Sequence, residues 1–135
     1  MAEQKFAVVE RKFEYKGREC IVVFTKLGFR SGYVSVKQLF DYEKLTDIDA
    51  HGGINFSGEL PDYYGATREY YIGFDCGHCW DGIDMDQAIA YGLQKANIKD
   101  NCLITDEPVR SIEYVSEECK KIVDQLEGNK YEQKV

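Results

Sequence analysis

Apolar residues at the start of the chain fall in short runs separated by polar turns, a pattern typical of β-strands. Phe6–Tyr15 and Cys20–Leu27 flank the tetrapeptide Lys16–Glu19, whose glycine and charged residues favour a hairpin turn. Tyr33–Val36 is a further short extended segment. Lys37–Thr46 has no clean period, so we expect a loop or a short helix there.

Asp47–Gly58 and Arg68–His78 are the most informative pair of segments. Both are rich in Ile, Phe and Tyr, and they bracket Glu59–Thr67, which contains a proline and a glycine. This arrangement predicts two antiparallel strands joined by a long loop. If the loop is symmetric, His51 lies opposite Cys76 in the paired strands.

The same register has consequences for the two faces of the first strand. Asp49 would lie opposite His78, and the period of two puts Asp49, His51 and Asn55 on one face. We expect this face to be exposed or to line a cleft. The opposite, apolar face should contact the core, and it carries Ile48, Ala50, Ile54 and Phe56.

Helical periodicity is confined to the second half of the chain. In Val109–Leu126 apolar residues recur at spacings of three, four and seven. Asp106 is placed to cap this helix, Pro108 to occupy its first turn, and Gly128 to end it. Met85–Lys95 has an apolar residue at every fourth position, which predicts a shorter helix.

Strands early and helices late predict an α+β fold, in which an antiparallel β-sheet of about four to five strands packs against a long C-terminal helix. The length of 135 residues fits one domain, and no repeat or linker divides it. We therefore expect a single domain over residues 1–135, with residues 129–135 frayed.

Composition excludes two classes of protein. A hydrophobic content of 44% argues against a disordered chain. No segment approaches the ~18 consecutive apolar residues of a membrane span, and the first residues lack the pattern of a secretion signal. The sequence therefore predicts a soluble, cytoplasmic protein with no membrane contact.

The net charge of −7 disfavours direct nucleic-acid binding, because such binding depends on Lys and Arg side chains that neutralise phosphates. Solubility alone explains an acidic chain. A sharper interpretation is an acidic surface that docks into a basic groove, such as the nucleic-acid channel of another protein.

The cysteine count points to reduced thiols. An odd number of cysteines in a chain without a secretion signal argues against a disulfide framework. We expect Cys20, Cys102 and Cys119 to be small buried apolar residues.

Candidate chemistry converges on His51 and the segment Asp75–Asp84. This segment holds the second histidine, two cysteines and several carboxylates, and the predicted pairing puts His51 beside it. Histidine is the side chain that ordinarily titrates near neutral pH. The cluster is therefore a candidate site, although a polar strand end with satisfied hydrogen bonds would look the same.

A redox interpretation rests on Cys76–Cys79, which reads Cys-Gly-His-Cys and looks like the active site of protein disulfide isomerases. That motif requires its first thiol at a helix N-terminus, where the thiol pKa is lowered. Here Trp80–Gly82 follow, which form helices poorly and add negative charge. The redox interpretation is therefore disfavoured.

A metal interpretation uses the two histidines. His51 and His78 with Asp75 or Asp81 would suit a divalent metal of the hydrolytic kind. The same histidines with the two cysteines of the segment are also ligand types that zinc accepts. However, the adjacent side chains of His78 and Cys79 seldom both reach one ion.

A third interpretation is a preorganised binding cleft. The glycines after His51 allow a ligand or a neighbouring backbone to approach closely. Trp80 and nearby tyrosines could stack on a flat group or anchor a protein partner. The candidate ligand- or partner-binding residues are His51, Gly53, Asn55, Asp75, Cys76, His78, Trp80 and Asp81.

Three motifs give the chain a family resemblance. His51–Gly58 reads HGGINFSG, Tyr71–His78 reads YIGFDCGH with Asp81 soon after, and Tyr114–Cys119 reads YVSEEC. The chain resembles a family of small phage and prophage proteins with HGG-(I/L)-x-(F/Y)-x-G and W-x-G-F-D-C-x-H motifs. The likeness spans residues 13–126.

Two positions depart from the family pattern. Tyr71 replaces the common tryptophan, and Cys79 stands where the family usually has no cysteine. The second departure further weakens the redox interpretation. The residues to which the family motifs carry over are His51, Gly52, Gly53, Asp75, Cys76, His78 and Asp81.

The resemblance implies an accessory protein of phage type in the cytoplasm of a host bacterium. Our leading hypothesis is a non-enzymatic binder that counters a host defence system, by blocking a nuclease complex or capturing a nucleotide second messenger. The alternatives are a small metal-dependent hydrolase that uses His51, His78, Asp75 and Asp81, and a structural or assembly protein.

Overall fold

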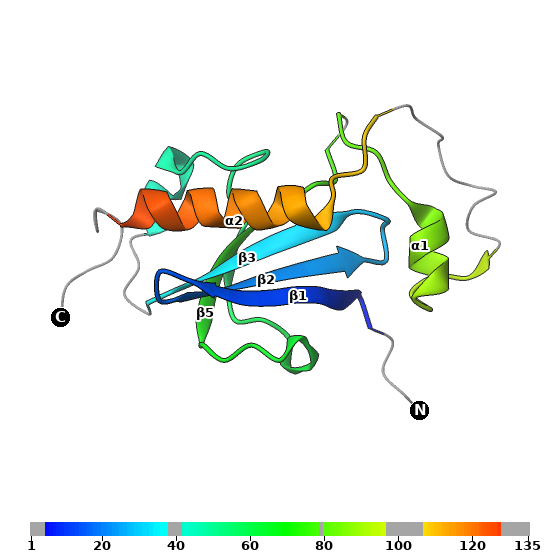
Figure 1. The fold of residues 1–135 in the computed structure, drawn as a ribbon, viewed down its shortest axis with the longest axis horizontal. Helices are drawn as coiled ribbons and strands as arrows, with labels where there is room; N and C mark the ends of the chain where they lie inside the picture. Colours follow the sequence, from blue (N-terminus) through cyan, green and yellow to red (C-terminus); the bar gives the residue numbers. More distant parts are fainter. Residues whose placement is uncertain (1–4, 38–41, 79, 97–106, 128–135) are drawn as a thin grey trace.

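A five-stranded antiparallel sheet with one long helix across it forms the protein, as the computed structural model shows for residues 5–37, 42–78, 80–96 and 107–127. Helix α2 (Ile112–Leu126) lies over one face of the sheet (Figure 1). The predicted α+β fold is therefore confirmed. In sheet order the strands are β1 (Ala7–Tyr15), β2 (Arg18–Thr25), β3 (Arg30–Val36), β5 (Tyr70–Asp75) and β4 (Phe56–Gly58).

Three short helices complete the described secondary structure. The 3-10 helix η1 (Tyr42–Asp47) overlaps Lys37–Thr46, for which a loop or a short helix was expected, and η2 (Asp62–Tyr64) lies in the loop between the central pair of strands. Helix α1 (Met85–Ala90) ends earlier than predicted, and Gly92 with a φ of 76° follows it. Over the described residues, neither α-helix has the length and apolar character that crossing a bilayer requires.

The main core lies between the sheet and α2. Inward side chains of β2 and β3, such as Val22 and Val34, pack against the apolar stripe of the helix. Cys20 and Cys119 are completely buried there, as predicted. Cys102 lies outside the described residues. The helix stripe consists of Val115, Cys119, Ile122, Val123 and Leu126.

The predicted strand Asp47–Gly58 is wrong over most of its length, because only its last three residues pair with β5. Gly52 and Gly53 have φ angles of 69° and 85°, which turn the chain instead of extending it. The register differs as well, since Phe56 pairs with Gly73, whereas the predicted pairing puts it opposite Tyr71.

The predicted faces of this segment are also partly wrong. Ile48, Ala50 and Ile54 do reach the core beneath α2, but Phe56 packs in a second cluster with Tyr33 and Tyr71. Since Tyr33 alternates with the inward-facing Val34 along β3, this second cluster lies on the sheet face opposite α2.

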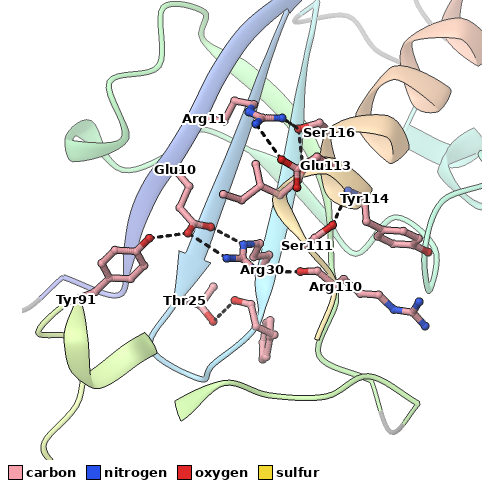
Figure 2. A network of polar contacts seen from close by, with 12 residues as sticks. Glu10, Arg11, Thr25, Arg30, Tyr91, Arg110, Ser111, Glu113, Tyr114 and Ser116 are labelled. Carbon is pink, nitrogen blue, oxygen red and sulfur yellow. Dashed lines mark hydrogen bonds and ion pairs between the residues drawn. The ribbon is translucent and has the colours of Figure 1, made fainter. Parts of the chain in front are cut away.

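Hydrogen bonds connect the start of α2 to the sheet (Figure 2). The guanidinium of Arg30 donates to the Glu10 carboxylate over 2.6 and 3.2 Å, and to the Arg110 carbonyl over 3.0 Å. Ser111 caps the helix, where Oγ accepts from the Tyr114 amide at 3.1 Å. Asp106 is therefore too early in the chain to cap α2, and Pro108 precedes its first turn. Asp106 itself, Gly128 and residues 129–135 lie outside the described residues.

Replacing Ser111 with alanine is expected to lower the free energy of unfolding by about 1 kcal/mol, because the Tyr114 amide loses its side-chain acceptor. Urea unfolding followed by circular dichroism measures this loss. Ser111→Asp retains an acceptor and should stay close to the wild type. Equal losses in both variants would contradict a capping role.

Candidate functional site

His51 sits in the turn before β4 and is buried, contrary to the expectation of an exposed or cleft-lining side chain. Its ring reaches two other segments of the chain. Nδ1 lies 2.7 Å from the Tyr114 hydroxyl of α2, and Nε2 lies 2.8 Å from Oδ2 of Asp81. The imidazole therefore links the turn, the segment after β5 and the last helix.

Asp81 is the hub of this arrangement, and its side chain is fully buried. Oδ2 accepts from His51, from the His78 amide at 3.1 Å and from His78 Nδ1 at 3.2 Å. Oδ1 accepts from Arg110 Nε at 2.9 Å. Four donors thus surround one carboxylate. We call His51, His78, Asp81, Arg110 and Tyr114 the Asp81 cluster.

The hydrogen bonds determine the charge and proton positions in the cluster. Burial by itself raises the pKa of Asp81, but the hydrogen bonds from His51, Arg110 and His78 more than offset this and bring it to about 2. An ionised carboxylate only accepts, so His51 Nε2 carries a proton. Burial also raises the pKa of Tyr114, whose hydroxyl oxygen lies 2.7 Å from His51 Nδ1.

Stability should depend on pH through Asp81. Its pKa is lowered from 3.8 to about 2 on folding, so the stabilisation is complete above pH ~4 and is lost as the pH falls towards 2. The shift corresponds to about 2 kcal/mol. Urea unfolding between these pH values should show the loss in the wild type and a flatter dependence in Asp81→Asn. Parallel curves for the two proteins would contradict the assignment.

The family motif glycine Gly52 makes room for His78. A Cβ on Gly52 would lie 2.1 Å from Cε1 of the His78 ring. On top of His78 lies the indole of Trp80, with ring centroids 4.6 Å apart and planes inclined by 6°. Trp80 as a whole residue remains 46% exposed. The structure therefore brings His51, His78, Trp80 and Asp81 together, as the sequence suggested.

The other predicted residues lie at the margin of the cluster or outside it. The Asp75 carboxylate accepts from Asn55 Nδ2 and from the Gly77 amide, and its Oδ1 is 3.9 Å from His78 Nδ1. Gly53 donates its amide to the Ala50 carbonyl within the turn.

Cys76 does not support redox chemistry. It is completely buried, and burial raises the pKa of its thiol to about 12, so the reactive thiolate is disfavoured at neutral pH. Cys79, the second cysteine of the Cys-Gly-His-Cys motif, lies outside the described residues. The buried first thiol alone removes the low-pKa nucleophile that this motif needs.

Sequence reasoning missed two members of the cluster. Arg110 and Tyr114 come from the start of α2, far along the chain from His51 and Asp81. Tyr114 opens the YVSEEC motif, but it was not among the residues to which the resemblance assigned a place in the site. Nothing local marks Arg110, which precedes the helix as one of several charged residues.

Three residues of the cluster form a group that could hold a metal ion. One ligand atom from each of His51, His78 and Asp81 lies within 4.8 Å of the others. These residue types suit zinc and related divalent ions. The Arg110 guanidinium on the same carboxylate opposes a second cation there, because its positive charge lies close by.

Comparison with known proteins adds no family, since no family model, no curated protein and no solved structure matches the chain. The resemblance to phage and prophage proteins therefore stays a prediction, and the site is interpreted from its own geometry.

Proposed function

We propose that the protein is a non-enzymatic binder whose contact surface is centred on Trp80. The observation that carries this proposal is an exposed indole stacked in parallel on His78, which is itself held by the buried Asp81 carboxylate. Exposed aromatic side chains are frequent anchors of interfaces. An anchor that is fixed before binding loses less conformational entropy on binding.

The Asp81 cluster supports this proposal better than it supports catalysis. A general base needs a free acceptor within reach of a substrate. Four protein donors already surround the Asp81 carboxylate, and both ring nitrogens of His51 have partners inside the fold. We infer that the cluster positions the Trp80 segment.

The partner we propose is a component of a host defence system, in keeping with the resemblance to phage and prophage proteins. A protein partner with a basic groove would complement the acidic chain. On α2, the exposed carboxylates of Glu113 and Glu117 are each paired with a cation, Arg11 at 3.4 Å and Lys120 at 3.3 Å, so the attraction would come from the net charge of the chain. The alternative partner is a nucleotide signal, whose base would stack on the Trp80 indole.

The fluorescence of Trp80 reports on binding directly, because Trp80 is the single tryptophan of the chain. Titration with cyclic and linear nucleotides should shift its fluorescence if the ligand is a nucleotide signal. For a protein partner, purified protein is incubated with host lysate, and bound proteins are identified by mass spectrometry. Trp80→Ala should lose the partner, whereas Tyr63→Ala, which removes another exposed aromatic ring, should retain it. Retention by Trp80→Ala would overturn the proposal.

The second candidate function is a metal-dependent hydrolase, which the grouping of His51, His78 and Asp81 favours. Native mass spectrometry of protein purified without added metal or chelator separates the two candidates. Stoichiometric metal that disappears in His51→Ala would support the hydrolase. Protein that carries no metal and still binds its partner through Trp80 would support the binding function.

A further inference from the structure

The sheet face opposite α2 contains a pocket of about 300 Å³ at the end where β2 turns into β3. Its walls are mainly aromatic. Phe29, Tyr33 and Phe56 line it, and Phe6 adds a fourth ring that is 41% exposed. Apolar walls with a few polar groups are typical of small-ligand sites.

Two of these rings are fixed by the sheet. Tyr33 and Phe56 meet edge to face, with centroids 5.3 Å apart and an angle of 82° between the planes. Gly73 pairs with Tyr33 across β3 and β5, and a Cβ there would lie 2.5 Å from the Tyr33 ring. The glycine thus allows the Tyr33 ring to lie over β5, and the aromatic wall exists before any ligand arrives.

Asp75 is the charged side chain among the described residues that line the pocket. Asn55 Nδ2 and the Gly77 amide each donate to one of its oxygens, which orients the carboxylate. Its side chain remains 31% exposed. Each carboxylate oxygen can accept more than one hydrogen bond, so both oxygens keep acceptor capacity for a ligand.

We propose that this pocket binds a guanidinium group on an aliphatic stem, as in an arginine side chain. A guanidinium is a planar cation that stacks on aromatic faces and donates two parallel hydrogen bonds to one carboxylate. The Lys26 ammonium, 5.9 Å from the Phe6 centroid, makes this kind of contact, and an entering guanidinium would take its place. The Asp75 carboxylate lies 3.9 Å from Nδ1 of His78, the residue beneath Trp80, but the pocket contains neither His78 nor Trp80, so the two proposals are tested separately.

The test is an NMR titration of the ¹⁵N-labelled full chain with Nα-acetyl-arginine N-methylamide. The amide signals of Tyr33, Phe56 and Asp75 should shift, with a Kd on the order of 1 mM. The citrulline analogue has the same shape without the charge and should bind at least tenfold more weakly. Asp75→Asn should weaken arginine binding at least tenfold, whereas Asp62→Asn removes a carboxylate outside the pocket and should not change it.

A second variant tests whether weaker binding by Asp75→Asn could come from a local structural change alone. Phe6→Ala removes an exposed ring near the start of the described chain and should weaken binding several-fold while the melting temperature stays close to the wild type. Equal affinity for the arginine and citrulline analogues would overturn the proposal. Unchanged arginine affinity in both variants would also overturn it, as would an absence of shifts at these amides.

Discussion

Asp81→Ala is expected to lower the free energy of unfolding by about 3–5 kcal/mol, the loss typical of a buried ionic group that is deprived of its partner. The substitution removes the acceptor of four hydrogen bonds and leaves the buried N–H of His51 unpaired. For a domain of this size the melting temperature should fall by roughly 10 °C or more. Thermal and urea unfolding measure both quantities.

The matched control for this variant is Asp62→Ala. Asp62 is an exposed carboxylate in η2, and its removal should change the free energy of unfolding by less than about 0.5 kcal/mol. If Asp81→Ala were as mild as this control, the Asp81 cluster would contribute little to folding. Its buried carboxylate would then require a functional explanation, and the metal-dependent hydrolase would gain support.

Gly52→Ala should cost about 3 kcal/mol, through two effects that a second substitution separates. The positive φ of 69° disfavours any side chain by about 1 kcal/mol. In addition, the new methyl group would overlap the His78 ring, which lies 2.1 Å from the position of the added Cβ. Because Trp80 stacks on that ring, its fluorescence should change even in the folded variant.

Gly53→Ala is the control for the backbone effect. Gly53 has a similar φ of 85°, but no atom lies within 4 Å of an added Cβ. It should therefore lose only about 1 kcal/mol and leave the fluorescence of Trp80 unchanged. Equal losses of stability in the two variants would show that the His78 ring moves away at little cost. This result would contradict the inference that the ring is held firmly beneath the indole.

The fold was predictable where local patterns and packing agree. The first hairpin and the last helix have clear apolar patterns, and the structure places them close to the expected bounds. Asp47–Gly58 failed because its Ile and Phe residues indicate a strand, whereas Gly52 and Gly53 introduce positive φ angles. Propensity averages over a segment, and two consecutive turn-forming glycines are enough to override it.

The candidate site was anticipated through an incorrect contact. The predicted pairing brought His51 to Cys76, whereas its partner is the Asp81 carboxylate five residues further along. The prediction that His51 lies near His78 and Asp81 was nevertheless correct. Arg110 joins only through tertiary packing, because the Arg30 side chain holds its carbonyl. Such a contact has no local signal in the sequence.

The Asp81 cluster joins residues that are 30 and 63 positions apart in the chain. Closing a loop costs conformational entropy that grows slowly with the length of the loop. We predict that these contacts form after the rate-limiting step of folding. Substitutions in the cluster should then accelerate unfolding more than they slow refolding. The cluster would thus lower the rate of unfolding. It would set how long the protein remains folded in the cell, and it would have little effect on how quickly the protein folds.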